Sequence, residues 1–449
     1  MKANSSLGIL LLAVLGWSGL PAAVSATELL PLPACSKNAD ARALTVVDAV
    51  DLALCRHPLT RESWAQARVQ SAQLGISEAA WRPRLDARSS WQERRSGGVD
   101  SEQRSAELNL SWLLYDFGLR AANEENARQL LAAALASRDA TLQAVFLAAV
   151  QAYYNTQATQ AAQAAALLAE KAAARSQEAA EARYRAGSAT PADRLLAQTA
   201  RSQATLARIR SEGEARTARG ALASALGFSA AQPLPLAPLA ALPPAADFSA
   251  DVERLIGEAQ QRRPDLLAAQ AQVQAAEAAV AAARAQGRPS LSLGAGPQWQ
   301  SLGGRETQVG SLGLTLSVPL FTGFEHTWRV RQAEAQRDLR QAQQERQQNQ
   351  VALDVWKAWH GLQTATQAWQ ASGDLLASAE QSARVALGRY QAGVGTVLDL
   401  LTAQAAEASA RQQRIQSELD WNVQRATLAQ ALGRLEPGWL ATAAGEQGW

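Results

Sequence analysis

The chain has 449 residues, and its 43 Lys and Arg residues against 41 Asp and Glu residues give a formal net charge of +2. This near-balance excludes the strongly basic surface that nucleic-acid binding requires, so we expect no nucleic-acid partner. Hydrophobic residues make up 47% of the chain but aromatic residues only 5%. Together with the many Ala and Gln residues, this composition is typical of long helices packed through small side chains.

The N-terminus has the pattern of a secretory signal peptide. Lys2 precedes an apolar run over 7–20, and small residues lead to a cleavage position after Ala26. The alternative is a retained membrane anchor, but the run is short for a bilayer span, which needs about 20 residues. No later stretch approaches about 18 consecutive apolar residues. We therefore expect residues 1–26 to be removed, and an exported chain that uses strands for any membrane contact.

Two cysteines, Cys35 and Cys55, lie close to this N-terminus. In an oxidising compartment they would form a disulfide that ties the extended segment 27–43 to the first helix, worth about 3 kcal/mol for a loop of this size. Lipidation of Cys35 is the alternative, but Pro33 stands where a lipidation motif has a small or aliphatic residue. The disulfide is the favoured interpretation.

The first half of the chain alternates between helix and strand patterns. Pro58 suits the first turn of a helix, and Arg82-Pro83 ends the helical periodicity before apolar and polar residues begin to alternate. No strong breaker then follows Gly118 until Gly187, which predicts one very long helix. The expected elements are a short helix over 45–56, a helix over 58–81, a β-hairpin over about 83–117 and a helical hairpin over about 118–227.

The second half repeats the first at a constant offset. Tyr184 and Asp193 recur as Tyr390 and Asp399, so that 390 − 184 and 399 − 193 both give 206. Such self-similarity at a fixed spacing indicates a tandem duplication. The expected divisions are a first repeat over 44–230, a Pro-rich linker over 231–249, a second repeat over 250–435 with a β-hairpin over about 289–320 and a helical hairpin over about 324–433, and a C-terminal tail over 436–449.

Each repeat therefore supplies two strands and a helical hairpin about 100 Å long. Four strands cannot close a barrel, because the smallest membrane barrels have eight, and unpaired backbone groups in lipid cost several kcal/mol each. A soluble antiparallel sheet is the alternative. The favoured fold class is mainly α with a membrane β-barrel part, in which copies of a tandem-duplicated protomer associate until no strand edge is left.

The tandem halves, the two strand hairpins and the paired Tyr-x-x-Gly-x-x-x-x-x-Asp motifs resemble the TolC family of outer-membrane factors over residues 44–435. This resemblance implies a homotrimer with a 12-stranded β-barrel in outer-membrane lipid. Its long coiled-coil helices would continue as an α-helical barrel into the periplasm of a Gram-negative bacterium. The stretch 45–64 is similar to the CyaE-like subgroup, whose members serve type I secretion.

The same resemblance implies an export duct that works with a periplasmic adaptor protein and an inner-membrane ABC transporter or other transporter. Type I protein secretion is the favoured system, and small-molecule or multidrug efflux is the alternative. A periplasmic coiled-coil scaffold or adhesin is an alternative of another class. The sequence contains no phosphate loop, nucleophile motif or metal-ligand spacing, and its three His residues are isolated. We expect no catalytic residue, no cofactor and no metal site.

The repeated motif is the first candidate site. The resemblance implies a periplasmic gate in which Tyr390 donates a hydrogen bond to Asp193, so that the second repeat holds the first closed. Asp399 would then line the constriction, and Tyr184 is the counterpart of Tyr390. The chain departs from the family pattern at Gly395, where an Arg of the closing network can stand, and fewer bonds would then hold the closed state.

The turns beside this motif are the second candidate site. Gly187 and Gly393 would close the long helices in the left-handed conformation, which is the purely structural interpretation. The functional interpretation is a surface that docks the adaptor protein. A second departure from the family pattern, Thr402 in place of an Asp, would make the entrance less selective for cations. The candidate docking residues are Gly187, Ser188, Pro191, Gly393, Val394 and Gly395.

Overall fold

The computed structural model describes residues 43–96, 99–237, 251–302 and 304–435. The expected signal peptide, Cys35, most of the Pro-rich linker and the C-terminal tail lie outside these residues. The described helices are α2 (Val46–Arg56), α3 (Pro58–Ala79), α4 (Leu119–Arg185), α5 (Pro191–Ala225), α6 (Val252–Arg262), α7 (Pro264–Ala285), α8 (Glu325–Gln391) and α9 (Val397–Ala431). The strands are β1 (Arg84–Ser96), β2 (Val99–Tyr115), β3 (Ser290–Leu302) and β4 (Arg305–Ser317).

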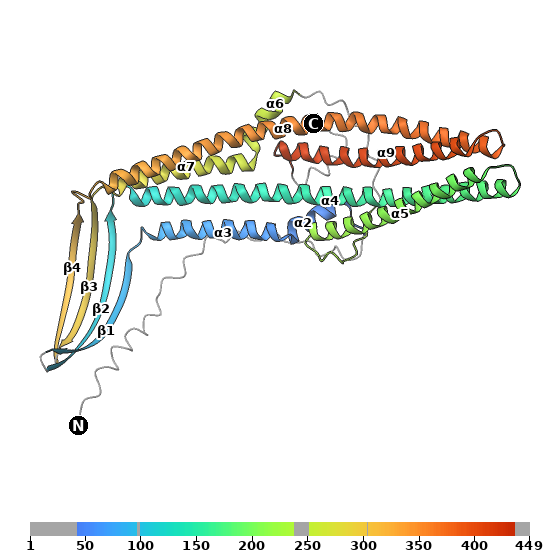
Figure 1. Cartoon of the computed structure of the whole chain (residues 1–449). Coiled ribbons are helices and arrows are strands. Elements are labelled where there is room, and N and C mark those ends of the chain that lie inside the picture. The colour runs from blue at the N-terminus through green and yellow to red at the C-terminus, as the bar shows by residue number, and fades with distance from the viewer. Residues whose placement is uncertain (1–42, 97–98, 238–250, 303, 436–449) are drawn as a thin grey trace.

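The two long helices set the length of the molecule. α4 and α8 have 67 residues each, which corresponds to about 100 Å. Figure 1 shows them running from the sheet at one end to two separate turns at the other. α4 begins after Gly118, whose φ is 98°, and α8 begins after Phe324, whose φ is 65°. Both helices therefore start from a left-handed residue at the junction with the sheet, and neither contains a proline that would interrupt it.

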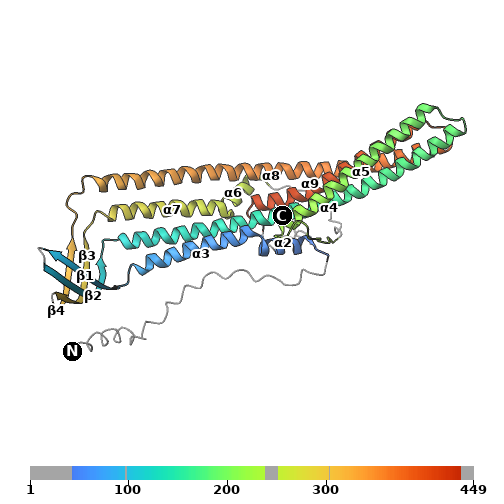
Figure 2. The same cartoon turned by 60° about the horizontal axis from the view of Figure 1, so that its bottom comes forward.

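Shorter helices pack beside the long ones in two tiers. Near the sheet, α3 and α7 contact α4, and α7 also contacts α8. Towards the free turns, α5 contacts α4, while α9 contacts both α8 and α4. Figure 2 shows the two tiers following one another along the long helices. Two short helices therefore lie end to end beside each long one, and the layer has α8 at one side and α3 with α5 at the other.

All four strands form one antiparallel sheet in the order β1-β2-β3-β4. The register pairs Leu85 with Leu110 and Leu291 with Leu316, so apolar residues of neighbouring strands share a face. On β4 this face is open, since Leu312 and Leu314 are 79% and 66% exposed. β1 and β4 each pair with one strand only within the described sheet. The sheet of a single chain therefore keeps two edges and an exposed apolar face.

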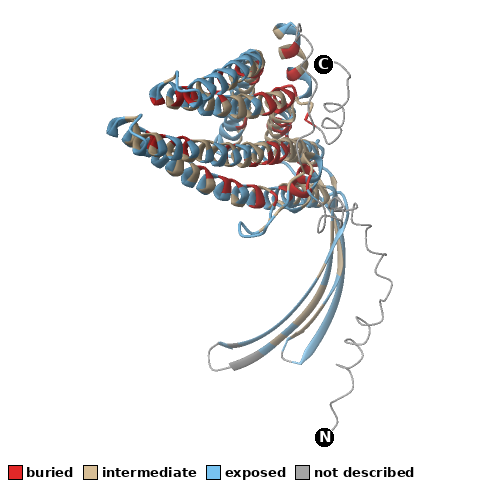
Figure 3. Ribbon diagram, turned by 90° about the vertical axis from the view of Figure 1, so that its right-hand side faces the viewer, coloured by how far each residue is buried: buried red, intermediate tan, exposed pale blue. Residues whose placement is uncertain are grey.

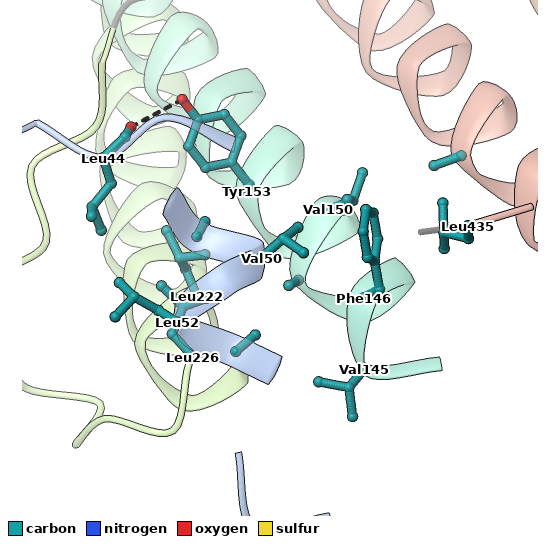
Figure 4. Packing of buried hydrophobic residues seen from close by; sticks show 14 of the residues in the cluster. Leu44, Val50, Leu52, Val145, Phe146, Val150, Tyr153, Leu222, Leu226 and Leu435 are labelled. Carbon is teal, nitrogen blue, oxygen red and sulfur yellow. Dashed lines mark hydrogen bonds between the residues drawn. The ribbon is translucent and has the colours of Figure 1, made fainter. Parts of the chain in front are cut away.

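The core lies at mid-length, where the short helix α2 crosses α4 and α5. Figure 3 shows buried residues along the helices and little burial in the strands. In the close-up of Figure 4, Val50 of α2 packs among Phe146, Leu222 and Leu226, and the Tyr153 hydroxyl donates to the Leu44 carbonyl at 3.2 Å. The second repeat builds a corresponding cluster from α6, α8 and α9. These clusters fix the short helices against the long ones in both repeats.

Two glycines of the repeat allow this close packing. Gly227 follows α5 with a φ of 77°, and a Cβ there would lie 2.9 Å from the carbonyl carbon and oxygen of Arg56 at the end of α2. Gly433 follows α9 with a φ of 69°, and its Cβ would lie 3.2 Å from the same atoms of Arg262 at the end of α6. At both positions the left-handed backbone conformation disfavours a side chain, and at Gly227 the close contact with Arg56 disfavours it further. The repeated Leu-Gly pairs therefore mark where each short helix meets the core.

One finding differs from the sequence analysis. By length and composition, α4 contains an 18-residue window apolar enough to cross a membrane, of which 17% is buried. α4 is about 100 Å long, roughly three times the thickness of the hydrocarbon layer of a bilayer. It contacts α3, α5, α7 and α9 along this length. Its Ala-rich surface therefore serves close packing between helices.

Candidate functional site at the helical tips

The two free turns, which we call tip 1 (residues 186–190, between α4 and α5) and tip 2 (residues 392–396, between α8 and α9), are built alike. In tip 1 the Ser188 amide donates to the Arg183 carbonyl at 2.9 Å, and in tip 2 the Val394 amide donates to the Arg389 carbonyl at 3.0 Å. Gly187 and Gly393 have φ values of 73° and 82°. The structural interpretation of both glycines, a left-handed helix cap, is thus confirmed.

The two aspartates of the motif cap the returning helices. Asp193 accepts hydrogen bonds from the Thr190 amide and hydroxyl, both at 2.9 Å, while its own amide donates to the Thr190 hydroxyl oxygen. Asp399 forms the same capping box with Thr396. The backbone and side-chain hydrogen bonds from Thr190 lower the pKa of Asp193, and the side-chain and backbone bonds with Thr396 lower that of Asp399. Both carboxylates therefore have a local structural role.

Tyr390 lies in the interface between the two helical hairpins. It is 4% exposed, and it packs against a cluster of apolar side chains from α4, α5 and α9. Among the described residues its hydroxyl has no hydrogen-bond partner. The structure therefore does not bond Tyr390 to Asp193 within this protomer, and the closing hydrogen bond stays a prediction. The apolar neighbours of Tyr390 are Ala180, Ala197, Val397 and Leu400.

Tyr184 has a different environment from its repeat counterpart. It is half-buried, and the Arg194 guanidinium carbon lies 4.8 Å from the centre of its ring. The offset of 206 places Leu400 where the first repeat has Arg194. Leu400 is fully buried and lies beside Tyr390. One difference between the repeats thus leaves Tyr184 beside a partly buried cation and Tyr390 enclosed in an apolar core.

Arg183 joins the two tips and was not singled out in the sequence analysis. It extends from the last turn of α4 and donates from Nη2 to the Tyr390 carbonyl. Its guanidinium carbon also lies 4.1 Å from the centre of the Tyr390 ring. A second contact between the hairpins is the hydrogen bond from Ser176 to Gln404 at 3.1 Å. An Arg precedes the motif tyrosine in both repeats, as Arg183 and Arg389, but nothing in the sequence pairs Arg183 with Tyr390.

The remaining candidate docking residues lie at the end of the molecule. Val394 is 69% exposed, and Ser188 and Pro191 are exposed as well. Pro191 is also the first residue of α5, a position where its missing amide costs nothing. At Gly395 a Cβ would lie 3.0 Å from the Tyr390 amide nitrogen and 3.1 Å from the Arg389 Cβ. The close turn of tip 2 therefore disfavours an Arg at position 395.

The histidines and cysteines were the remaining candidates for a metal site or a disulfide. In the part of the chain that the structure describes, no group of three or more His, Cys, Asp or Glu residues could hold a metal ion. The Nδ1 atom of His57 accepts from the Leu59 amide at 3.2 Å and caps α3, while His360 lies against the rings of Trp356 and Trp359. Cys55 lies near the end of α2, but Cys35 falls outside the described residues. The disulfide therefore stays a prediction.

A chain with a short sheet at one end, helices of about 100 Å and paired closed turns at the other end has the architecture of a duct-forming protein of the bacterial outer membrane. Sequence comparison agrees with this class. The family described as outer membrane efflux protein matches residues 49–228 and 255–434, which are the two repeats. The chain belongs to this family.

Individual relatives support the assignment. The chain is 33% identical to CyaE of Bordetella pertussis over 401 residues, which cover 87% of this chain and 84% of that protein. It is 25% identical to the outer membrane efflux protein BepC of Brucella suis over 388 residues, which cover 83% and 82% of the two chains.

Solved structures share the fold. The outer membrane protein VceC of Vibrio cholerae superposes with a TM-score of 0.75 at 22% identity, over 86% of this chain and 96% of that one. The MtrE outer membrane channel of Neisseria gonorrhoeae gives a TM-score of 0.75 at 23% identity, over 87% and 90%. The predicted resemblance and the predicted tandem-repeat fold class are thus confirmed, while the closure of several copies into one barrel stays a prediction. The chain is an outer-membrane channel protein that extends into the periplasm, and its family consists of channels rather than enzymes.

Proposed function

We propose that three copies of this chain close into one exit duct for type I protein secretion, engaged by a periplasmic adaptor and an inner-membrane ABC transporter. Three sheets of four strands would give a barrel of 12 strands, in which β4 of each copy pairs with β1 of the next. The helical layer supports the same closure, since α8 lies at one side and α3 with α5 at the other. The exposed apolar face of β4 would then contact outer-membrane lipid.

The assignment of cargo rests on one observation. Identity is higher to CyaE, at 33%, than to BepC, at 25%, with similar coverage. The resemblance of residues 45–64 to members that serve type I secretion supports the same choice. Small-molecule efflux is the second candidate function, favoured by the printed description of BepC and of the family as efflux proteins. In either system the energy would come from the partner transporter, because the duct itself is passive.

The tips would form the periplasmic entrance of this duct. They lie at the end of the helices farthest from the sheet (Figure 1), and in a trimer three copies of each tip would surround the opening. Asp193 and Asp399 would place carboxylates there, and the exposed residues Ser188, Pro191 and Val394 would face the adaptor.

A deletion experiment tests the choice of cargo. Loss of the gene should abolish secretion of one large protein into the culture medium and leave drug susceptibility unchanged. Raised susceptibility with normal secretion would instead establish efflux. Extraction tests the duct itself, because an outer-membrane trimer needs detergent and runs as a heat-sensitive oligomer on gels. A chain that is soluble without detergent would contradict the duct and favour the periplasmic scaffold.

A further inference from the structure

We propose that Arg183 is the positioning residue that holds the entrance closed, by fixing tip 2 to tip 1 through the backbone carbonyl and the ring of Tyr390. The proposal rests on the proposed function, because closure matters only if the tips surround the entrance of a duct. Closure then depends on the side chain of Arg183 in the first repeat and on the backbone carbonyl and ring of Tyr390 in the second. The hydroxyl of Tyr390 has no part in it.

The two contacts of Arg183 use different properties of the guanidinium. Its Nη2 donates to the Tyr390 carbonyl in the last turn of α8, where the helix dipole places partial negative charge. Its planar face lies over the Tyr390 ring, with the central carbon 4.1 Å from the ring centre. A lysine has one charged nitrogen and no planar face, so it cannot make both contacts.

The position of Tyr390 makes this contact effective. Tyr390 is 4% exposed, and its ring is enclosed by residues of α4, α5 and α9. Its carbonyl also accepts the Gly393 amide at 3.1 Å, so the atom that Arg183 holds is part of the turn of tip 2. The hydroxyl is buried without a partner among the described residues. The ring and the backbone of Tyr390, and not its hydroxyl, therefore connect the two hairpins.

The second repeat makes no equivalent of the contact between Arg183 and Tyr390 among the described residues. Arg389, the repeat counterpart of Arg183, is exposed, and its charge acts on Asp399. Tyr184, which Arg389 would have to reach for a symmetric contact, is covered by Arg194. The chain thus offers a matched control at the same place in the second repeat, with the same residue type and the same helix end.

Single-channel recordings in planar lipid bilayers test the proposal with the full-length trimer. Removing a charged hydrogen bond costs about 1.5–3 kcal/mol, so we expect Arg183→Ala to raise the ratio of open to closed channels about tenfold or more. Arg183→Lys should give an intermediate increase. Arg389→Ala should conduct like the wild type. Tyr390→Phe keeps the ring and the carbonyl that Arg183 contacts and removes only the hydroxyl, so it tests the alternative bond from Tyr390 to Asp193. If Arg183 only stabilised the fold, Arg183→Ala would lower the temperature at which the trimer dissociates and leave the ratio of open to closed channels unchanged.

The outcomes separate this proposal from the proposed function. If wild-type trimers form channels and Arg183→Ala and Arg183→Lys conduct as the wild type does, Arg183 does not hold the entrance. An increase with Tyr390→Phe would also overturn the proposal and would assign closure to the hydrogen bond between Tyr390 and Asp193. If the wild-type protein forms no channels at all, the proposed duct fails. Should Arg183→Ala not assemble, the Arg183→Lys measurement decides.

Discussion

The aspartates of the two tips show how a single charge orders a turn. Asp193 and Asp399 complete capping boxes, and the hydrogen bonds from Thr190 and Thr396 lower the pKa of each carboxyl from its ordinary value. A carboxyl whose pKa is lowered in the folded state stabilises that state above its unfolded pKa, and this contribution is lost as the pH falls through the folded pKa. The tips should therefore be ordered near neutral pH and loosen in acid.

We predict that amide exchange at both tips, corrected for its intrinsic rate, becomes faster as the pH falls from about 5 to about 2.5, while the core at α2 remains protected. Mass spectrometry of peptic peptides would measure this. Asp193→Asn should remove the pH dependence in tip 1 and leave it in tip 2, which serves as the internal control. Equal acceleration along the whole of α4 and α5 would show that global unfolding, and not loss of the caps, causes the change.

At the scale of elements, the junction of α5 with α2 depends on a glycine. Gly227 has a φ of 77°, and a Cβ there would lie 2.9 Å from backbone atoms of Arg56. We predict that Gly227→Ala lowers the free energy of unfolding by about 1–3 kcal/mol, because alanine is strained in this conformation and the contact displaces α2. The dissociation temperature of the trimer on gels and its resistance to urea would report the change.

The control for this prediction lies in the same helix. Gly213 is exposed in the middle of α5, and a Cβ there would meet nothing within 4 Å. Gly213→Ala should stabilise the protein by about 0.5–1 kcal/mol, since alanine favours the helix interior. If both substitutions shift stability in the same direction, the close contact with Arg56 does not decide the effect.

The sequence predicted most of the fold because the relevant signals are local. The offset of 206 between repeats and the long runs without a strong breaker placed the long helices within a few residues of α4 and α8. The contacts of the candidate site could not be predicted in the same way, because the residues that make them are far apart in the sequence. Arg183 and Tyr390 are 207 residues apart. Only the packed structure shows that Leu400 in place of Arg194 leaves one tyrosine buried and the other partly exposed.

At the scale of the whole molecule, the open apolar face of β4 gives a test of membrane insertion. Leu314 is 66% exposed on the face shared with Leu312 and Leu316, while Thr315 points to the opposite face, which would line the lumen. We predict that Leu314→Arg costs about 2–4 kcal/mol in the membrane and sharply lowers the amount of heat-sensitive trimer in outer-membrane fractions. Thr315→Arg introduces the same charge one residue away, and it should assemble normally with altered ion selectivity. If the two variants assemble equally well, this face of β4 does not contact lipid.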